Sequence, residues 1–313
     1  MQDHTLPGAF VFFNLIFGGG FVPDALGDRM KAYENISRIY LTKRLPVIIR
    51  IDGRAFHSFT RGFLRPFDDL FHRTMWGTAQ ALCEQIGGAK LAYVQSDEIS
   101  LLLTNDDTLT TEPWFGNNLQ KLVSISASIA TLEFNKIFMS EYTAVDEMLE
   151  HAKEEAIKQD APLDLVACIR MGEAYEKSLM NAQFDSRAFV LPPSEVVNYF
   201  IWRQQDATRN SIQMVAQNLF SHKELMNKNT DQLQEMIFQE GINWNEYPVC
   251  YKRGVCCLKK RSETETTVKL GDGNTVKMYR NKWTIDKEIP VFTQDRSYIE
   301  NTYMAGDEDG RVH

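Results

Sequence analysis

Cysteine is scarce in this chain, and the spacing of the cysteines indicates no disulfide framework. The 313 residues contain five cysteines, an odd number, and none stand in a Cys-x-x-Cys pattern. This count and spacing argue against a disulfide-stabilised fold and against a zinc cluster. We therefore expect a reducing, cytoplasmic setting.

Positive charge is also in short supply. Lysine and arginine total 34 against 42 aspartates and glutamates, which gives a net charge of −8. Non-specific nucleic-acid coating depends on phosphate neutralisation by basic residues, so that class of protein is disfavoured, although a local basic surface is not excluded. The 43% hydrophobic and 24% charged residues exclude a disordered chain and a coiled-coil rod.

Long apolar runs are almost absent. Residues 9–17 are nearly all apolar and precede Gly18 to Gly20, but the run is shorter than the roughly 20 residues that span a bilayer. No lysine or arginine precedes Arg29, so a secretory signal is disfavoured. We interpret residues 1–23 as a packing or oligomer-forming arm, or an upstream extension, with a membrane anchor as the alternative. We find no other transmembrane candidate and predict no membrane partner.

The first half of the chain alternates strand and helix signals. Short β-branched runs predict strands, and apolar residues spaced by three and four predict helices. The predicted elements are a helix at 28–45, strand 46–51, helix 67–86, strands 91–94 and 99–103, helix 119–138, and strands 163–169 and 184–191. This order predicts an α+β protein with a ferredoxin-like, split βαβ sheet.

The second half differs in its pattern. It predicts a long helix at 194–220, two further helices up to residue 240, and a β-rich segment at 250–300 with a hairpin turn at 271–274. We therefore predict three regions: the arm at 1–23, a palm-like catalytic domain at 24–192, and a helical region with a β-rich C-terminal segment at 193–313.

Two carboxylates provide the clearest chemical signal. Asp52 ends a predicted strand and Asp97 lies in the tip of the following hairpin, 97 − 52 = 45 residues later. In a split βαβ sheet the first and third strands are neighbours, so these carboxylates can meet and hold Mg²⁺, as one or two ions. Gly53 would allow close approach of a triphosphate, and the N–H groups of Arg54 to His57 could cradle its oxygens. The alternative is a plain turn and a solvated hairpin tip.

Five ordered motifs closely resemble the tRNA-histidine guanylyltransferase superfamily. They lie within about residues 27–260, and are Arg50 to His57, Gln95 to Ser100, Phe115 to Lys121, Phe184 to Arg187 and Trp202 to Gln204. The resemblance implies a polymerase-type palm that adds nucleotides to the 5′ end of tRNA in the 3′→5′ direction. Activation of the 5′ end would consume ATP or GTP, and NTPs would be added. A homotetramer, with tRNA reaching across subunits, is also implied.

The resemblance also implies roles for particular residues. Two Mg²⁺ ions would be held by Asp52, the Gly53 carbonyl and Asp97, with Glu98 as a third catalytic acid in a supporting role. The implied nucleotide-binding residues are Asp52, Gly53, Arg54, Ala55, Phe56, His57, Arg65, Asp68, Ser96, Asp97 and Lys121. We call the segment Arg54 to His57 the phosphate loop, and we expect His57 to shape this loop rather than act as a general base.

Two departures from the eukaryotic pattern bear on specificity. The His-Ile-Asn-Asn segment of eukaryotic members is Thr208 to Ser211 here, and an arginine upstream of Lys121 is Asn118. Both make the chain look like the bacterial and archaeal guanylyltransferase-like proteins, which implies template-directed repair of 5′-truncated tRNAs.

RNA contacts and competing functions remain open at this stage. Candidates for RNA binding are Arg203, Arg209, Asn210, Lys252 and Arg253, with an ordinary solvated face as the alternative. Two other functions are considered: a palm-type nucleotide cyclase, whose Gly-Gly-Asp-Glu-Phe hairpin is absent here, and a non-catalytic RNA-binding module.

Overall fold

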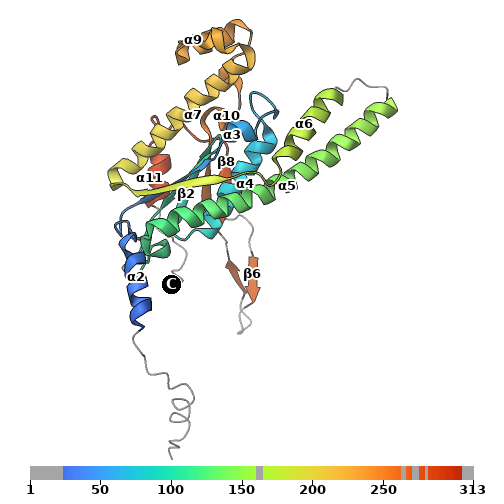
Figure 1. Ribbon diagram of the computed structural model, residues 1–313. Coiled ribbons are helices and arrows are strands. Elements are labelled where there is room, and N and C mark those ends of the chain that lie inside the picture. The colour runs from blue at the N-terminus through green and yellow to red at the C-terminus, as the bar shows by residue number, and fades with distance from the viewer. Residues whose placement is uncertain (1–23, 160–164, 262–265, 270–274, 279–280, 305–313) are drawn as a thin grey trace, which may run out of the picture. The chain divides into compact units, whose positions relative to one another are not determined.

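A computed structural model describes residues 24–159, 165–261, 266–269, 275–278 and 281–304 (Figure 1). The chain divides into two units, residues 1–39 and 40–313. In the first unit the described element is helix α2 (Ala25–Ile36), which Asp24 caps by accepting a hydrogen bond from the Gly27 N–H. The predicted arm at 1–23 and the predicted turn at 271–274 lie outside the described residues.

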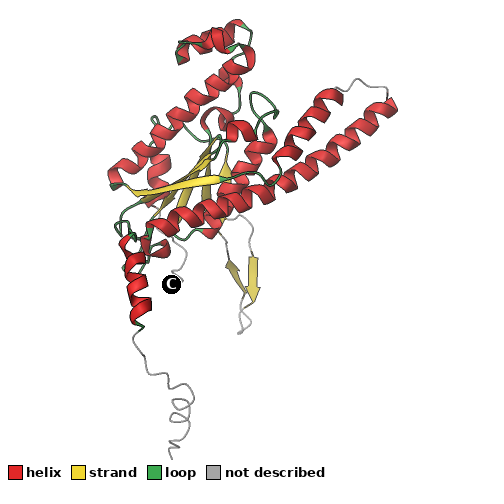
Figure 2. Ribbon diagram, in the orientation of Figure 1, coloured by secondary structure: helices red, strands yellow, loops and turns green. Residues whose placement is uncertain are grey.

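The second unit is built on an antiparallel sheet in the order β4-β1-β3-β2-β5-β8 (Figure 2). Its strands are β1 (Val47–Gly53), β2 (Ala89–Gln95), β3 (Glu98–Leu103), β4 (Phe184–Val190), β5 (Val255–Arg261) and β8 (Asn281–Asp286). A separate two-stranded ribbon pairs β6 (Thr266–Lys269) with β7 (Thr275–Met278). The α+β class is confirmed, and β5 and β8 extend the sheet formed by the first four strands.

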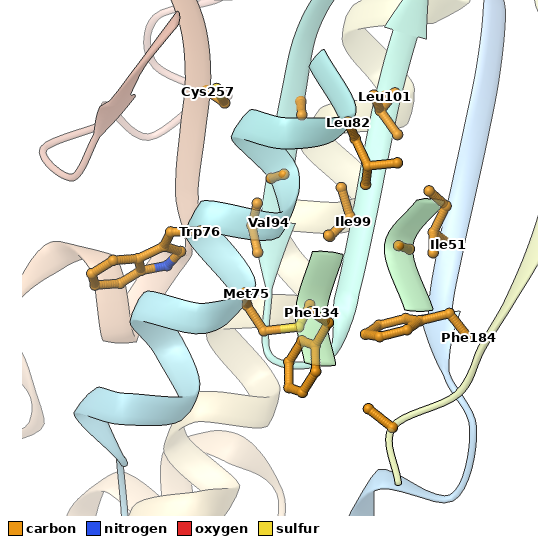
Figure 3. Close-up of a cluster of buried hydrophobic side chains, with 14 of the residues drawn as sticks. Ile51, Met75, Trp76, Leu82, Val94, Ile99, Leu101, Phe134, Phe184 and Cys257 are labelled. Atoms are coloured by element: carbon orange, nitrogen blue, oxygen red, sulfur yellow. The ribbon is translucent and has the colours of Figure 1, made fainter. Parts of the chain in front are cut away.

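The sheet separates two apolar cores, because alternate residues of each strand point to opposite faces. Ile49, Ile51 and Val94 face one core, which helices α4 (Asp69–Gln85) and α5 (Leu119–Gln159) cover (Figure 3). Ile48 and Tyr93 face the other core, which contains residues of α7 (Val196–Leu219) and α11 (Ser297–Met304). Burial on both faces explains why the central strands read as continuous apolar runs rather than alternating ones.

Local signals in the sequence set the beginning of α4 and the β2–β3 hairpin. Asp68 caps α4, accepting a 2.9 Å hydrogen bond from the Phe71 N–H. The hairpin turns through Ser96 and Asp97, and Ser96 adopts a positive φ of 46°. The predicted hairpin is therefore confirmed, with Asp97 in the turn and Glu98 already the first residue of β3.

Helix α5 is longer than predicted and forms an antiparallel hairpin with α6 (Leu165–Ser178; Figure 1). Its stretch Leu119–His151, with a mean hydropathy of 1.2, is long and apolar enough to cross a membrane by length and composition alone, although the sequence predicted no further transmembrane candidate. Phe134 and Phe138 of this stretch are fully buried in the core below the sheet. A core helix passes the same length-and-composition test, so this signal is weak.

Two predicted elements were wrong. The described part of the predicted strand at 163–169 is helical, within α6, because Met171, Ala174 and Tyr175 pack at helical spacing against the core that α5 covers. The helix predicted at 28–45 ends at Ile36, and Tyr40 instead forms an isolated bridge with Asn118.

The remaining elements lie partly in the region predicted as the palm, 24–192, and partly in the region 193–313. They are the short helices α3 (Phe56–Phe59), α8 (His222–Leu225) and α10 (Val249–Arg253), helix α9 (Thr230–Gln239), and 3₁₀ turns at Trp114–Asn117, Pro193–Glu195 and Trp244–Glu246. The C-terminal part of α7 packs on α9 through a third apolar cluster that includes Val215 and Ile237.

Candidate active site

The ends of β1 and of the β2–β3 hairpin meet at one edge of the sheet, as the sequence predicted. Asp52 lies opposite Glu98 in the β1–β3 ladder. The Gly53 N–H donates a 3.0 Å hydrogen bond to the main-chain carbonyl of Asp97, which ties the two chain segments together. Asp52 and Asp97 are thus brought to adjoining positions from distant parts of the sequence.

Burial makes both carboxylates costly to ionise. Burial raises the pKa of Asp97 to about 6, and the nearby charge of Asp52 adds to the rise. Burial also raises the pKa of Asp52, with a further contribution from Asp185, its neighbour across the β1–β4 ladder. Desolvation and like charge both favour the neutral carboxyl, so a bound cation would stabilise this pair in its ionised form.

The Glu98 carboxylate is hydrogen-bonded to other side chains of the protein. Its carboxylate accepts two hydrogen bonds from Arg203, from Nε at 2.7 Å and Nη2 at 2.8 Å. Arg50 lies 3.9 Å away and the Ser100 hydroxyl donates at 3.3 Å. Both members of the Glu98–Arg203 pair are buried, so Glu98 fixes the base of the hairpin from the α7 side of the sheet.

The loop after β1 forms a tight turn into α3. A Cβ on Gly53 would lie 2.4 Å from the Phe56 ring, so only glycine fits. Ala55 adopts a positive φ of 56° and caps α3. The N–H groups of Ala55, Phe56 and His57 have no acceptor among the described residues, whereas the Arg54 N–H is bound to the Gln183 carbonyl at 2.8 Å. The predicted cradle therefore has three open donors, and Arg54 does not contribute its N–H.

A pocket of about 360 Å³ opens beside this loop. It lies between α3, the 63–66 segment, the β2–β3 turn and α7. Its lining includes the predicted residues Phe56, His57, Arg65, Asp68, Ser96 and Asp97. Met214 and Gln217 of α7 complete the wall, and sequence reasoning missed them because no motif reaches that turn of the helix.

Asp68 and Lys121 do not offer the nucleotide contacts that were predicted for them. The Asp68 carboxylate is saturated by protein donors: Phe71 N–H on one oxygen, and Leu64 N–H at 2.9 Å and Tyr175 hydroxyl at 2.7 Å on the other. It shapes the pocket wall and has little capacity left for a ligand. Lys121 is exposed, with its ammonium 5.5 Å from the Phe115 ring centre.

The position of Lys121 along α5 separates it from the carboxylates. Thr131 of α5 accepts a hydrogen bond from the N–H of Phe184, which lies opposite Gly53. Lys121 stands ten residues earlier, about 15 Å along the helix at 1.5 Å per residue. Within one chain it is therefore remote from Asp52 and Asp97.

The predicted RNA-binding residues divide into exposed and buried groups. Arg209 and Asn210 are exposed on α7, and Asn210 lies beside Ser96 in the wall of a small pocket. Arg203 is buried on Glu98 and Asp206, and Lys252 is buried with its ammonium bound to the Asn245 carbonyl. Arg253 is half-buried. The positions of Arg203 and Lys252 do not fit the exposed phosphate contacts that were predicted for them.

Comparison with known proteins identifies the family. A family model described as tRNAHis guanylyltransferase matches residues 27–192. The chain belongs to the tRNAHis guanylyltransferase family. It is therefore a nucleotidyltransferase, as the motifs implied.

Individual members of this family are similar over most of the chain. A bacterial tRNA(His) guanylyltransferase-like protein solved with ATP is 43% identical, covers 89% of this chain and 98% of its own, and superposes with a TM-score of 0.69. A structure of such a protein solved with GTP gives 42% identity, coverages of 90% and 100%, and a TM-score of 0.67. A probable tRNA(His) guanylyltransferase of Drosophila melanogaster is 29% identical over 69% of this chain and 67% of its own length.

The donor set fits the magnesium that the family implies. No group of three or more His, Cys, Asp or Glu side chains in the described part of the chain is arranged to hold a metal by itself. Mg²⁺ does not require one, because it commonly takes one or two carboxylates and completes its shell with substrate phosphates and water. Two half-buried, mutually repelling carboxylates, one of which lines a pocket beside open N–H donors, match that requirement.

Proposed function

We propose that this protein adds nucleotides to the 5′ end of tRNA in the 3′→5′ direction, with template-directed repair of 5′-truncated tRNA as its main activity. The 5′-monophosphate would first attack the α-phosphorus of ATP or GTP and release pyrophosphate. The 3′-hydroxyl of an incoming NTP would then attack the activated 5′-phosphate and release AMP or GMP. Both steps are phosphoryl transfers, which depend on positioning and on neutralising charge rather than on a protein nucleophile.

One observation carries this proposal: Asp97, which adjoins Asp52, lines a pocket together with Phe56 and His57, whose main-chain N–H groups are open. The pocket of about 360 Å³ is large enough for the activating nucleotide, and the N–H groups of Phe56 and His57 would bind its phosphate oxygens. The relatives solved with ATP and with GTP support nucleotide binding by this chain.

Each residue group has a distinct task in this proposal. Asp52, Asp97 and the Gly53 carbonyl would hold Mg²⁺, which would neutralise charge on the transferring phosphate. The Glu98–Arg203 pair would hold the Asp97 turn in register with Asp52. His57 would shape the phosphate loop, since its ring Nε2 lies 3.1 Å from the neighbouring Ser58 hydroxyl.

The finer assignments are also part of the proposal. The strand order β4-β1-β3-β2, with α4 and α5 on one face, supports a ferredoxin-like palm. Thr208 to Ser211 and Asn118, in place of the eukaryotic residues, support repair over strict guanylation of histidine tRNA. The family resemblance supports a homotetramer, which sedimentation of the purified protein tests.

The test is a single-turnover assay with Mg²⁺, ATP and all four NTPs. Two 5′-³²P-monophosphorylated substrates are compared, full-length histidine tRNA and a tRNA lacking its first nucleotide. We expect extension chiefly of the truncated tRNA with the template-matched nucleotide. Guanosine addition only to histidine tRNA, whatever base lies opposite, would overturn the repair assignment and leave the transferase assignment standing.

Asp97→Asn is the matched negative control for this assay. It removes one predicted cation ligand with little change in size, so extension should fall to background while tRNA binding is retained. If Asp97→Asn extends tRNA as fast as the wild type, the site assignment is wrong. Formation of a cyclic nucleotide from NTP without RNA would instead support the cyclase alternative.

A further inference from the structure

A second, basic pocket lies on the other side of α3 from the nucleotide pocket. It has a volume of about 470 Å³ and is lined by α3, the C-terminal end of α6 and the segment before β4. Ala55 lines this pocket, whereas the next residues, Phe56 and His57, line the nucleotide pocket. The phosphate loop therefore forms a wall shared by two pockets.

The charges around this α3–α6 pocket are all of one sign. Its lining contains Arg54, Arg61 and Lys177 and no acidic side chain, in a protein whose net charge is −8. The Arg61 and Lys177 residues are exposed, and their side chains form no ion pair or hydrogen bond with the described residues. Unpaired cations that converge on a concave surface attract anions.

Arg54 is oriented into this pocket by the protein. Gln183 accepts hydrogen bonds from Arg54 twice, from the main-chain N–H at 2.8 Å and from the guanidinium Nη1 at 2.7 Å. This clamp leaves the other guanidinium donors available. The Ser178 hydroxyl donates a 2.8 Å hydrogen bond to the Phe59 carbonyl, which connects α6 to α3 in the pocket wall. The pocket is thus held in shape before any ligand arrives.

We propose that the α3–α6 pocket binds the phosphodiester backbone of the RNA substrate. The inference rests on the proposed function, since the RNA is the tRNA whose 5′ end enters the site. An open pocket whose polar lining consists of cations, Ser58, Ser178, Asn181 and Gln183 suits sequence-independent phosphate contacts. Because this pocket and the nucleotide pocket share the phosphate loop as a wall, RNA bound here would be positioned relative to Asp52 and would leave the nucleotide pocket free.

The test is the salt dependence of tRNA binding, measured by fluorescence anisotropy at equilibrium without NTPs. For the double variant Arg61→Ala/Lys177→Ala we expect the slope of log K against log salt to become shallower by just under 2, at about 0.9 per lost phosphate contact. The charge-preserving double variant Arg61→Lys/Lys177→Arg should keep the wild-type slope, which separates charge from fold. ATP affinity should be unchanged in both.

A matched control removes the same charge elsewhere. Lys43 and Lys282 are exposed near the opposite end of the sheet, so Lys43→Ala/Lys282→Ala lowers the net charge equally. An unchanged slope in Arg61→Ala/Lys177→Ala, or an equal change in the control, would overturn the proposal. A loss of tripolyphosphate or ATP affinity with an unchanged tRNA slope would reassign the pocket to a free polyphosphate.

These outcomes are separable from failure of the proposed function. If the wild type binds tRNA with the expected salt slopes but extends none, the proposed activity fails and the RNA pocket stands. If extension is observed but the double variant binds like the wild type, the activity stands and the pocket assignment fails.

Discussion

The buried pair of Glu98 and Arg203 allows a quantitative test of how the hairpin is held. Arg203 donates to Glu98 at 2.7 and 2.8 Å, and the side chains are 7% and 11% exposed. Replacing Arg203 by Met would keep most of the side-chain volume and leave the Glu98 carboxylate buried without its main partner. Breaking a buried pair in this way costs about 3–5 kcal/mol.

The structure places the expected loss at the lower end of this range. Arg50 lies 3.9 Å from Glu98 and would supply part of the lost interaction. We therefore expect Arg203→Met to lower the free energy of unfolding by about 3 kcal/mol. The measurement is urea unfolding at pH 7.5, followed by circular dichroism.

Arg209 provides a control on the same helix. It pairs with Asp206 at 2.8 Å but is 49% exposed. Arg209→Met should cost no more than about 1 kcal/mol, because exposed pairs are screened by water. The double variant Glu98→Gln/Arg203→Met should recover much of the loss, because no buried charge is left unpaired. If Arg203→Met costs no more than Arg209→Met, the pair does not hold the hairpin and the reasoning fails.

Three further predictions concern the pocket walls. Gly53→Ala places a methyl group 2.4 Å from the Phe56 ring, so the overpacking cost of about 1–3 kcal/mol should appear as weaker ATP binding. Gly172→Ala, whose added methyl would meet nothing within 4 Å, should bind ATP as the wild type does. Calorimetry measures both affinities. Asp68→Ala removes a helix cap and leaves donors unpaired, so urea unfolding should show a loss of about 2–4 kcal/mol, with Tyr175→Phe losing only about 1 kcal/mol. Burial lowers the pKa of His72, so the unfolded chain binds more protons than the folded one below about pH 6.5 and the free energy of unfolding should fall as pH drops through that value. In urea titrations at pH 7.5 and 5.5, His72→Phe should lose less stability on acidification than the wild type; an equal loss would contradict the assignment.

Local patterns predicted most of the elements that build the site. The β1 run and the β2–β3 hairpin were readable because each is a short apolar segment bounded by a turn pair. Because β1 and β3 are neighbouring antiparallel strands, Asp52 at the end of β1 lies beside Asp97 in the turn before β3. The strand predicted at 163–169 failed because a short apolar stretch fits a buried strand and a buried helix equally well, and the longer helical period becomes visible only further along α6.

Burial of charge was the property that the sequence could not supply. Arg203 and Arg209 are both arginines on α7, yet one is buried against Glu98 and the other faces solvent. Motif matching treated them alike as RNA contacts. The distance of Lys121 from the carboxylates was equally invisible, because it depends on where α5 crosses β4.

The Glu98–Arg203 pair also explains why neighbouring acids in one motif have different tasks. Residues 97 and 98 are adjacent, but Asp97 lies in the turn and Glu98 begins β3. Successive strand residues point to opposite faces, so Glu98 is directed toward α7, where Arg203 neutralises it. A second free carboxylate at the turn would add repulsion to a pair whose ionisation is already disfavoured by burial. Pairing Glu98 with arginine offsets part of that repulsion and anchors the turn through its main chain, which leaves Asp97 and Asp52 as the carboxylates available to the proposed cation.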